Sequence, residues 1–103
     1  MPEFQKTAVL IGVKQRGTPI WEVNDNLDEL EQLAMTAGAK VETRIIQERG
    51  RPDPATFIGK GMVNEMKDYV RSGGVNLVIF DDDLSPAQAR NLEKKLGCKI
   101  IDR

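Results

Sequence analysis

The sequence predicts an α/β domain with a four-stranded parallel sheet and helices on both faces. Short apolar segments alternate with longer amphipathic segments, in the order βαβαβαβ. Residues 7–13 (TAVLIGV) are apolar almost throughout, as expected of a strand buried on both faces. With this strand central and right-handed crossovers, we expect the strand order 2-1-3-4. The length of 103 residues suits one domain, so we take 1–103 as a single unit.

The first half of the chain contains two predicted strands and one predicted helix. The helix is predicted by a stripe of apolar residues at steps of three and four: Val23, Leu27, Leu30, Ala34 and Ala37. Gly38 stands where a left-handed C-terminal cap belongs. Residues 41–47 (VETRIIQ) are rich in β-branched side chains and predict the second strand. Residues 49–54 (RGRPDP) contain one Gly and two Pro, which predicts a loop.

The second half repeats this alternation. Gly59, Lys60 and Gly61 open a second helix, whose apolar stripe is followed by residues 72–74 (SGG). Residues 77–80 (LVIF) predict a third buried strand. A third helix is predicted by a capping box with Pro at the first helical position, formed by Ser85, Pro86 and Gln88. Gly97 ends that helix, residues 99–102 begin a fourth strand, and the stop at Arg103 suggests a piece of a longer protein.

The composition excludes several kinds of site. The chain has no His, so a serine or cysteine nucleophile with an imidazole base is excluded. A zinc site of Cys and His is excluded as well, because Cys98 is the only cysteine. A single cysteine also makes a reducing cytoplasm the natural expectation, and no apolar run is long enough to span a bilayer. We expect Cys98 itself to be a small buried side chain.

Charge is balanced overall but unevenly distributed. The 15 basic and 16 acidic residues give a net charge of −1, so a nucleic-acid partner would require a local basic patch. Residues 22–31 carry five acidic residues and no basic one. Arg49 and Arg51 flank a glycine in the predicted loop, which favours a phosphate contact, although an ordinary solvated surface would have the same charges.

The Gly59–Gly61 segment is a candidate anion site. It is not a P-loop, because Pro54 stands where the first glycine is needed and Gly61 replaces the Ser or Thr. Two glycines at a helix N-terminus nevertheless expose backbone amides, and Lys60 adds positive charge, so an RNA phosphate could bind there. The alternative is that the glycines only shape the turn.

Two further features leave alternatives open. Asp81–Asp83 follow the third strand and could hold magnesium, but we favour solvated loop residues, one of them near a helix N-terminus. We therefore predict no metal site and no catalytic residue. Trp21, just before the first apolar stripe, either packs against the core or is an exposed contact for a partner.

Several longer segments resemble the N-terminal domain of the HflX family of ribosome-associated GTPases. They are RPDPATFIGKGMVNEM (residues 51–66) and LVIFDDDLSPAQARNLEKKLGCKIIDR (residues 77–103), preceded by LAMTAGAKVETRIIQ (residues 33–47). Phe57 and Met62 depart from this pattern, since the family often has Tyr and Lys there.

The resemblance implies a cytoplasmic parent GTPase that binds the large ribosomal subunit and splits or rescues stalled ribosomes under stress. GTP and Mg²⁺ would bind in a GTPase domain outside this chain, so no cofactor and no GTP hydrolysis are expected here. The expected partners are ribosomal RNA and protein and the parent's own GTPase domain. The expected RNA contacts are Arg49, Arg51 and Lys60, with Arg44 as further support. The alternatives are an adenine-nucleotide-binding domain with weak ATPase activity, or a scaffold that pairs through its last strand.

Overall fold

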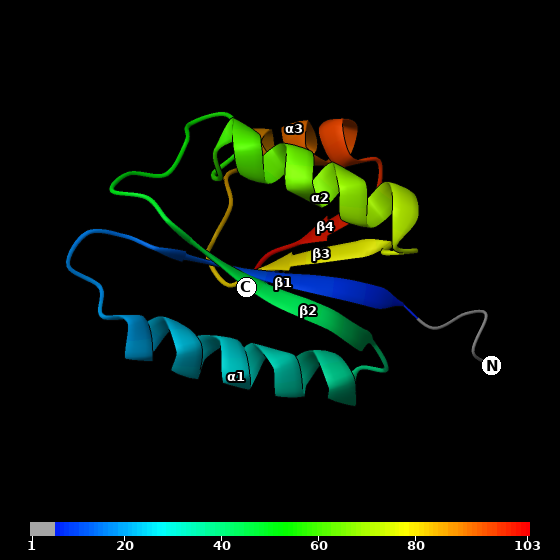
Figure 1. The fold of residues 1–103 in the computed structure, drawn as a ribbon, viewed down its shortest axis with the longest axis horizontal. Helices are drawn as coiled ribbons and strands as arrows, with labels where there is room; N and C mark the ends of the chain where they lie inside the picture. Colours follow the sequence, from blue (N-terminus) through cyan, green and yellow to red (C-terminus); the bar gives the residue numbers. More distant parts are fainter. Residues whose placement is uncertain (1–5) are drawn as a thin grey trace.

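The fold is an open parallel sheet with three crossover helices (Figure 1). The structure is a computed structural model, and it describes residues 6–103. The strands are β1 (Thr7–Lys14), β2 (Lys40–Glu48), β3 (Leu77–Phe80) and β4 (Lys99–Ile101), and the helices are α1 (Ile20–Thr36), α2 (Lys60–Ser72) and α3 (Pro86–Leu96). All strand pairs are parallel, in the order β2-β1-β3-β4. The predicted fold class and strand order are therefore confirmed.

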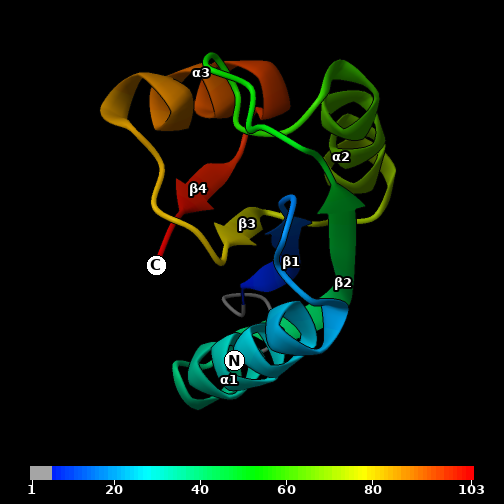
Figure 2. The same ribbon diagram turned by 90° about the vertical axis from the view of Figure 1, so that its left-hand side faces the viewer.

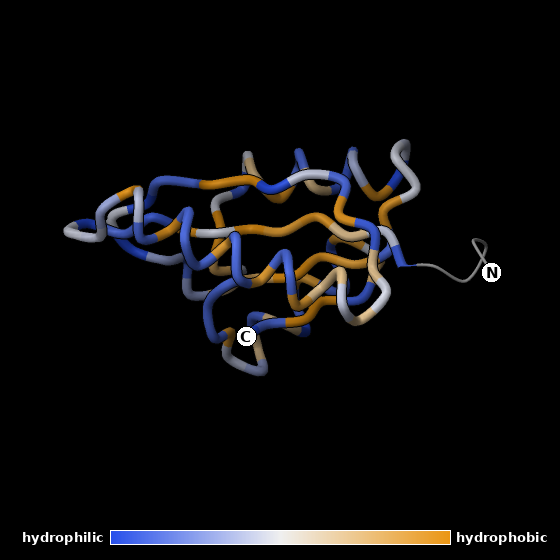
Figure 3. Tube along the Cα trace, turned by 90° about the horizontal axis from the view of Figure 1, so that it is seen from below, coloured by the Kyte–Doolittle hydropathy of each residue, from blue (hydrophilic) through white to orange (hydrophobic). Residues whose placement is uncertain are grey.

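The helices form two unequal layers. Helix α1 covers one face of the sheet, and α2 and α3 lie side by side on the other (Figure 2). Strand β1 supplies both cores, because alternate side chains of a strand point to opposite faces. Ala8 and Leu10 pack in the cluster with α1, whereas Val9 and Ile11 pack in the cluster with α2 and α3. In Figure 3 the hydrophobic colour accordingly follows the inner strands, while the helical turns alternate between the two colours.

Helix α1 approaches the sheet closely at Gly12. A Cβ atom at this position would lie 3.0 Å from Val23 Cγ1 and 3.1 Å from Leu27 Cδ1. Both of these α1 side chains are buried. The lack of a side chain at Gly12 therefore allows the apolar stripe of α1 to lie directly on β1.

The helix ends agree with the capping residues of the sequence. Ser85 Oγ accepts a hydrogen bond from the Gln88 amide at 3.0 Å, and Gln88 Oε1 accepts from the Ser85 amide at 2.9 Å, so the predicted capping box is present. Gly38 has a φ of 94°, as predicted for a left-handed cap, and Gly97, which was predicted to end the third helix, has a φ of 71°. The fourth strand ends at Ile101, one residue earlier than predicted, and the carboxylate of the next residue, Asp102, accepts the Leu84 amide through Oδ2 at 2.7 Å.

Candidate functional site

The loop between β2 and α2 is held in a defined shape. Asp53 Oδ1 accepts the amides of Ala55 and Thr56 at 2.7 and 3.1 Å, and these bonds are the main cause that lowers the pKa of Asp53. From α3, Gln88 Nε2 donates to the Asp53 carbonyl at 2.8 Å. Phe57 has a φ of 67° and packs its ring edge-on against Phe80. These contacts fix the loop to the core and so position the start of α2.

The N-terminus of α2 presents unpaired backbone amides. Gly59 is the N-cap residue, and among the described residues no side chain caps this helix. The Gly59 amide donates to Gln47 Oε1 at 3.1 Å, and the first helical bond runs from the Val63 amide to the Gly59 carbonyl. The next three amides, of residues 60–62, therefore have no carbonyl partner within the helix. Gly61 leaves this end open, since a Cβ there would contact nothing within 4 Å.

Arg49 lies beside this helix end. A Cβ atom on Gly59 would be 2.5 Å from Arg49 Nη1, so the guanidinium packs directly on the glycine. Arg49 Nε donates to the carbonyl of Arg51 at 3.1 Å, which fixes the plane of the group. The structure thus brings Arg49 to the start of α2, where Gly59 and Lys60 lie, although the loop separates Arg49 from them in the sequence. Gly59 therefore leaves room for a cation at the N-terminus of α2, and the binding of an anion there stays a prediction.

The sequence reasoning missed two basic residues of the same region. Lys14 is the last residue of β1 and Arg16 follows it, and with Arg49 they line a hollow of about 360 Å³ between the β1–α1 and β2–α2 loops. The Arg16 guanidinium packs against Gly50, 3.5 Å from where a Cβ would be. The sequence did contain a signal for these two residues, because the carboxyl ends of neighbouring parallel strands lie at the same edge of a sheet. In the structure, Lys14 at the end of β1 is accordingly the register partner of Glu48 at the end of β2. We call Lys14, Arg16, Arg49, Arg51 and Lys60 the basic rim.

The basic rim is a local excess of positive charge. Within residues 6–103, ion pairs involve only two basic side chains, Arg44 and Arg103, and neither belongs to the rim. Glu48 lines the same hollow as Lys14, Arg16 and Arg49, and the charge of Arg49 contributes, after the amides of Ala55 and Thr56, to the lowered pKa of Asp53. Five cations against these two carboxylates leave a net positive charge that can attract a polyanion, even though the chain as a whole is nearly neutral.

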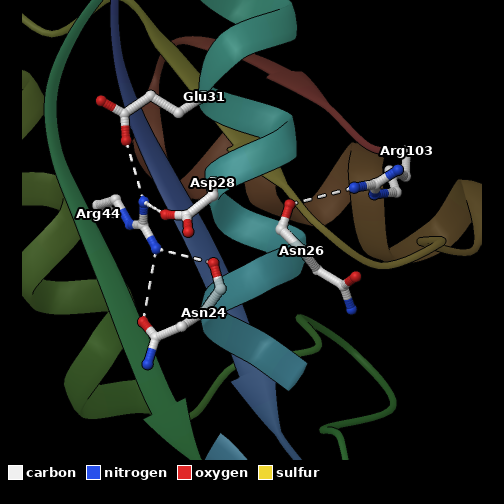
Figure 4. A network of polar contacts seen from close by, with 6 residues as sticks. All are labelled: Asn24, Asn26, Asp28, Glu31, Arg44 and Arg103. Atoms are coloured by element: carbon white, nitrogen blue, oxygen red, sulfur yellow. Dashed lines mark hydrogen bonds and ion pairs between the residues drawn. The ribbon is translucent and has the colours of Figure 1, made fainter. Parts of the chain in front are cut away.

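Arg44 lies elsewhere, in a clamp between β2 and α1 (Figure 4). Its Nη1 is 2.5 Å from Asp28 Oδ1 and 3.1 Å from Glu31 Oε1, and its Nη2 donates to the Asn24 carbonyl at 3.0 Å. The bond to Asp28 is the largest cause that raises the pKa of Arg44. The guanidinium of this β2 residue thus already has three partners on α1, and a role of Arg44 in RNA binding stays a prediction.

The acidic segment Asp81–Asp83 is not a shared cation site. Asp81 Oδ1 accepts from Arg103 Nε at 2.6 Å, and only 9% of the Asp81 side chain is exposed, so this residue is not the solvated group that we expected. Burial, followed by repulsion from Asp81, raises the pKa of Asp82. Among the described residues, no three acidic, His or Cys side chains are grouped so that they could hold a metal ion.

Trp21 and Cys98 differ in their exposure to solvent. Trp21 is 63% exposed in the first turn of α1, so it does not pack into the core. Cys98 is half-buried against the α2–α3 core, and desolvation raises the pKa of its thiol. No helix in residues 6–103 has the length and apolar character to cross a membrane.

Together with a family model, the fold assigns this α/β domain to the class found at the N-terminus of GTP-binding proteins. A family model described as GTP-binding GTPase N-terminal matches residues 24–103. The chain belongs to this family, as the N-terminal domain of an HflX GTPase.

Curated relatives match most of the chain. The HflX GTPase of Flavobacterium psychrophilum is 40% identical over 100 residues, which cover 97% of this chain and 24% of that protein. The HflX GTPase of Escherichia coli is 40% identical over 79 residues, which cover 77% of this chain and 18% of that protein. The chain therefore spans about a quarter or less of the length of these relatives.

A solved structure shares the fold. The crystal structure of a GTP-binding protein from the archaeon Sulfolobus solfataricus, in complex with GDP, superposes with a TM-score of 0.69 at 20% identity. The match covers 95% of this chain and 27% of that protein.

Proposed function

We propose that this chain is a docking module that holds an HflX-type GTPase on the large ribosomal subunit in the cytoplasm. The basic rim supplies the contacts, with Arg49, Arg51 and Lys60 bound to RNA phosphates. The module itself performs no chemistry; GTP hydrolysis and the splitting or rescue of ribosomes belong to the rest of the parent protein, which binds GTP and Mg²⁺. Arg44 is left out of this contact set because three residues of α1 hold its guanidinium.

One observation carries the proposal. Arg49 packs against Gly59 at the uncapped N-terminus of α2, Lys60 is the first residue of that helix, and no ion pair among the described residues involves either side chain. Arginine guanidinium groups and helix N-terminal amides are both good donors to phosphate oxygens. Membership in the HflX family supports the ribosome as the binding partner, since the resemblance implies a ribosome-associated parent.

Co-sedimentation of the chain with purified large subunits, over a range of salt concentrations, tests the proposal. The double variant Arg49→Ala/Arg51→Ala is expected to bind more weakly and to show a salt slope that is smaller by one to two, since about one counterion is released for each phosphate contact. The matched control is Arg71→Ala/Arg90→Ala, which removes two exposed arginines outside the rim. Equal affinity and slope for both double variants would reject the rim as the docking site.

A further inference from the structure

A second basic surface lies between α2 and α3. A groove of about 300 Å³ is lined by three lysines, Lys60 and Lys67 from α2 and Lys95 from α3. Lys60, Asn64 and Lys67 follow one another at steps of four and three, which places them on one face of α2. Helix α3 runs beside α2 on the same side of the sheet (Figure 2), and its Lys95 lines the same groove as these residues.

The charges of this groove are not balanced by its other residues. Asp53 is the single carboxylate among the described lining residues, and its Oδ1 already accepts two backbone amides. None of the three lysines takes part in an ion pair within residues 6–103. Three like charges around one groove repel one another, so a bound anion would relieve this repulsion.

We propose that this groove binds the phosphodiester backbone of a nucleic acid, as a continuation of the basic rim. The proposal rests on the proposed function, because a docking module for a ribonucleoprotein needs a surface that faces RNA. Lys60 belongs to both surfaces, so the two form one track from Arg49 to Lys95.

The shape of the track favours a polymer over a single small anion. Lys60 and Lys67 are seven residues apart, which corresponds to about 10 Å along a helix. A nucleic-acid strand carries one charge roughly every 3.4 Å and can neutralise both lysines together with Lys95. None of the described lining residues is aromatic, so the groove offers no surface for base stacking and would contact the backbone without regard to sequence.

The test measures binding of the chain to a fluorescently labelled RNA duplex as a function of salt concentration. The variant Lys67→Gln/Lys95→Gln is expected to bind more weakly at low salt, with a salt slope smaller by one to two. Gln is nearly as good a helix former as Lys, so the helices are expected to persist, which circular dichroism checks. The control Lys40→Gln/Lys99→Gln removes the same charge from the exposed first residues of β2 and β4, which do not line the groove, and is expected to bind as the unmodified chain does.

The outcomes separate this inference from the proposed function. If the chain binds large subunits but Lys67→Gln/Lys95→Gln binds the RNA duplex with the same affinity and salt slope as the control variant, the groove is rejected as a binding site and the proposed docking by the basic rim is unaffected. If the groove variant weakens duplex binding while the unmodified chain does not bind subunits, the groove stands and the docking role fails. A poly-glutamate peptide that displaces the duplex from the unmodified chain as well as unlabelled RNA does would also overturn the inference, since the groove would then recognise negative charge in general.

Discussion

The guanidinium of Arg49 occupies the space that a side chain on Gly59 would need. Gly59 has a φ of −74°, which any residue can adopt, so the glycine is required here by the close approach and not by its backbone angles. The two residues form a unit: the glycine admits the cation, and the cation lies at a helix end where the amides also attract anions. This unit is the centre of the proposed docking site.

The first prediction concerns the glycines at the start of α2. Gly59→Ala is expected to displace Arg49 and weaken binding to large subunits, with a loss of about 1 kcal/mol in unfolding free energy because Ala is a poor N-cap residue. Gly61→Ala is the matched control, since a Cβ there meets only open space. It is expected to keep the binding and to stabilise the fold by about 0.5–1 kcal/mol, through better helix propensity. Urea unfolding and co-sedimentation measure the two effects.

The second prediction separates two arginines. Arg44→Gln is expected to cost about 1 kcal/mol of stability, because it removes the clamp between β2 and α1, and to leave binding to large subunits unchanged. Arg49→Gln is expected to do the reverse, with weaker binding and little change in stability. If Arg44→Gln instead lost binding to large subunits at unchanged stability, the prediction would be contradicted and Arg44 would count among the RNA contacts.

The third prediction tests the capping box. Ser85→Ala is expected to lower the unfolding free energy by about 1 kcal/mol, because the Gln88 amide loses its acceptor. The comparison variant is Ser72→Ala in the last turn of α2. Its hydroxyl only donates to the Asp68 carbonyl at an exposed site, so a change within about 0.5 kcal/mol is expected. Equal losses in the two variants would contradict a specific role of the capping box.

The fourth prediction concerns two carboxyl groups with opposite pH dependence. Burial raises the pKa of Asp82 above its ordinary value of 3.8, so the folded state holds that proton more tightly than the unfolded state. This contribution to stability is complete below 3.8 and is lost as the pH rises through the folded pKa. Asp82→Asn avoids the loss, and we expect it to be more stable than the unmodified chain at pH 7 but not at pH 3.

The comparison for Asp82 is Asp53, whose pKa is lowered by the amides of Ala55 and Thr56. Its stabilisation is present above 3.8 and is lost as the pH falls through the folded pKa. Asp53→Asn is therefore expected to be less stable than the unmodified chain at pH 7, with the difference shrinking at low pH. Urea unfolding at a series of pH values checks both variants, and the same sign for both would refute the assignment.

The fold was predictable because local signals and the apolar pattern agree. The strand order follows from the alternation of buried segments and amphipathic helices. The two ends of α3 are indicated in the sequence by its capping residues, Ser85 and Gly97. The site was predictable only in part. Arg49 and Lys60 could be chosen from their loop, but the contact of Arg49 with Gly59 depends on how the loop folds back.

The residues that were harder to predict depend on tertiary contacts. A basic side chain such as Arg44 looks the same in a sequence whether it meets solvent or a carboxylate on another element, and its Asp28 partner is 16 residues away. Asp81 appeared solvated because its partner, Arg103, is 22 residues further along the chain. The groove residues Lys67 and Lys95 lie on separate helices, so nothing local connects them.

The unequal layers have a consequence for local opening. Helix α1 alone covers its face of the sheet, and besides its apolar stripe it is tied down by Arg44 from β2 and by Arg103, which also binds the Asn26 carbonyl (Figure 4). A helix without a neighbouring helix can detach as one unit while the opposite layer stays packed. Amide hydrogen exchange should therefore proceed faster in α1 than in the central strand, and high salt, which screens both arginine clamps, should widen that gap.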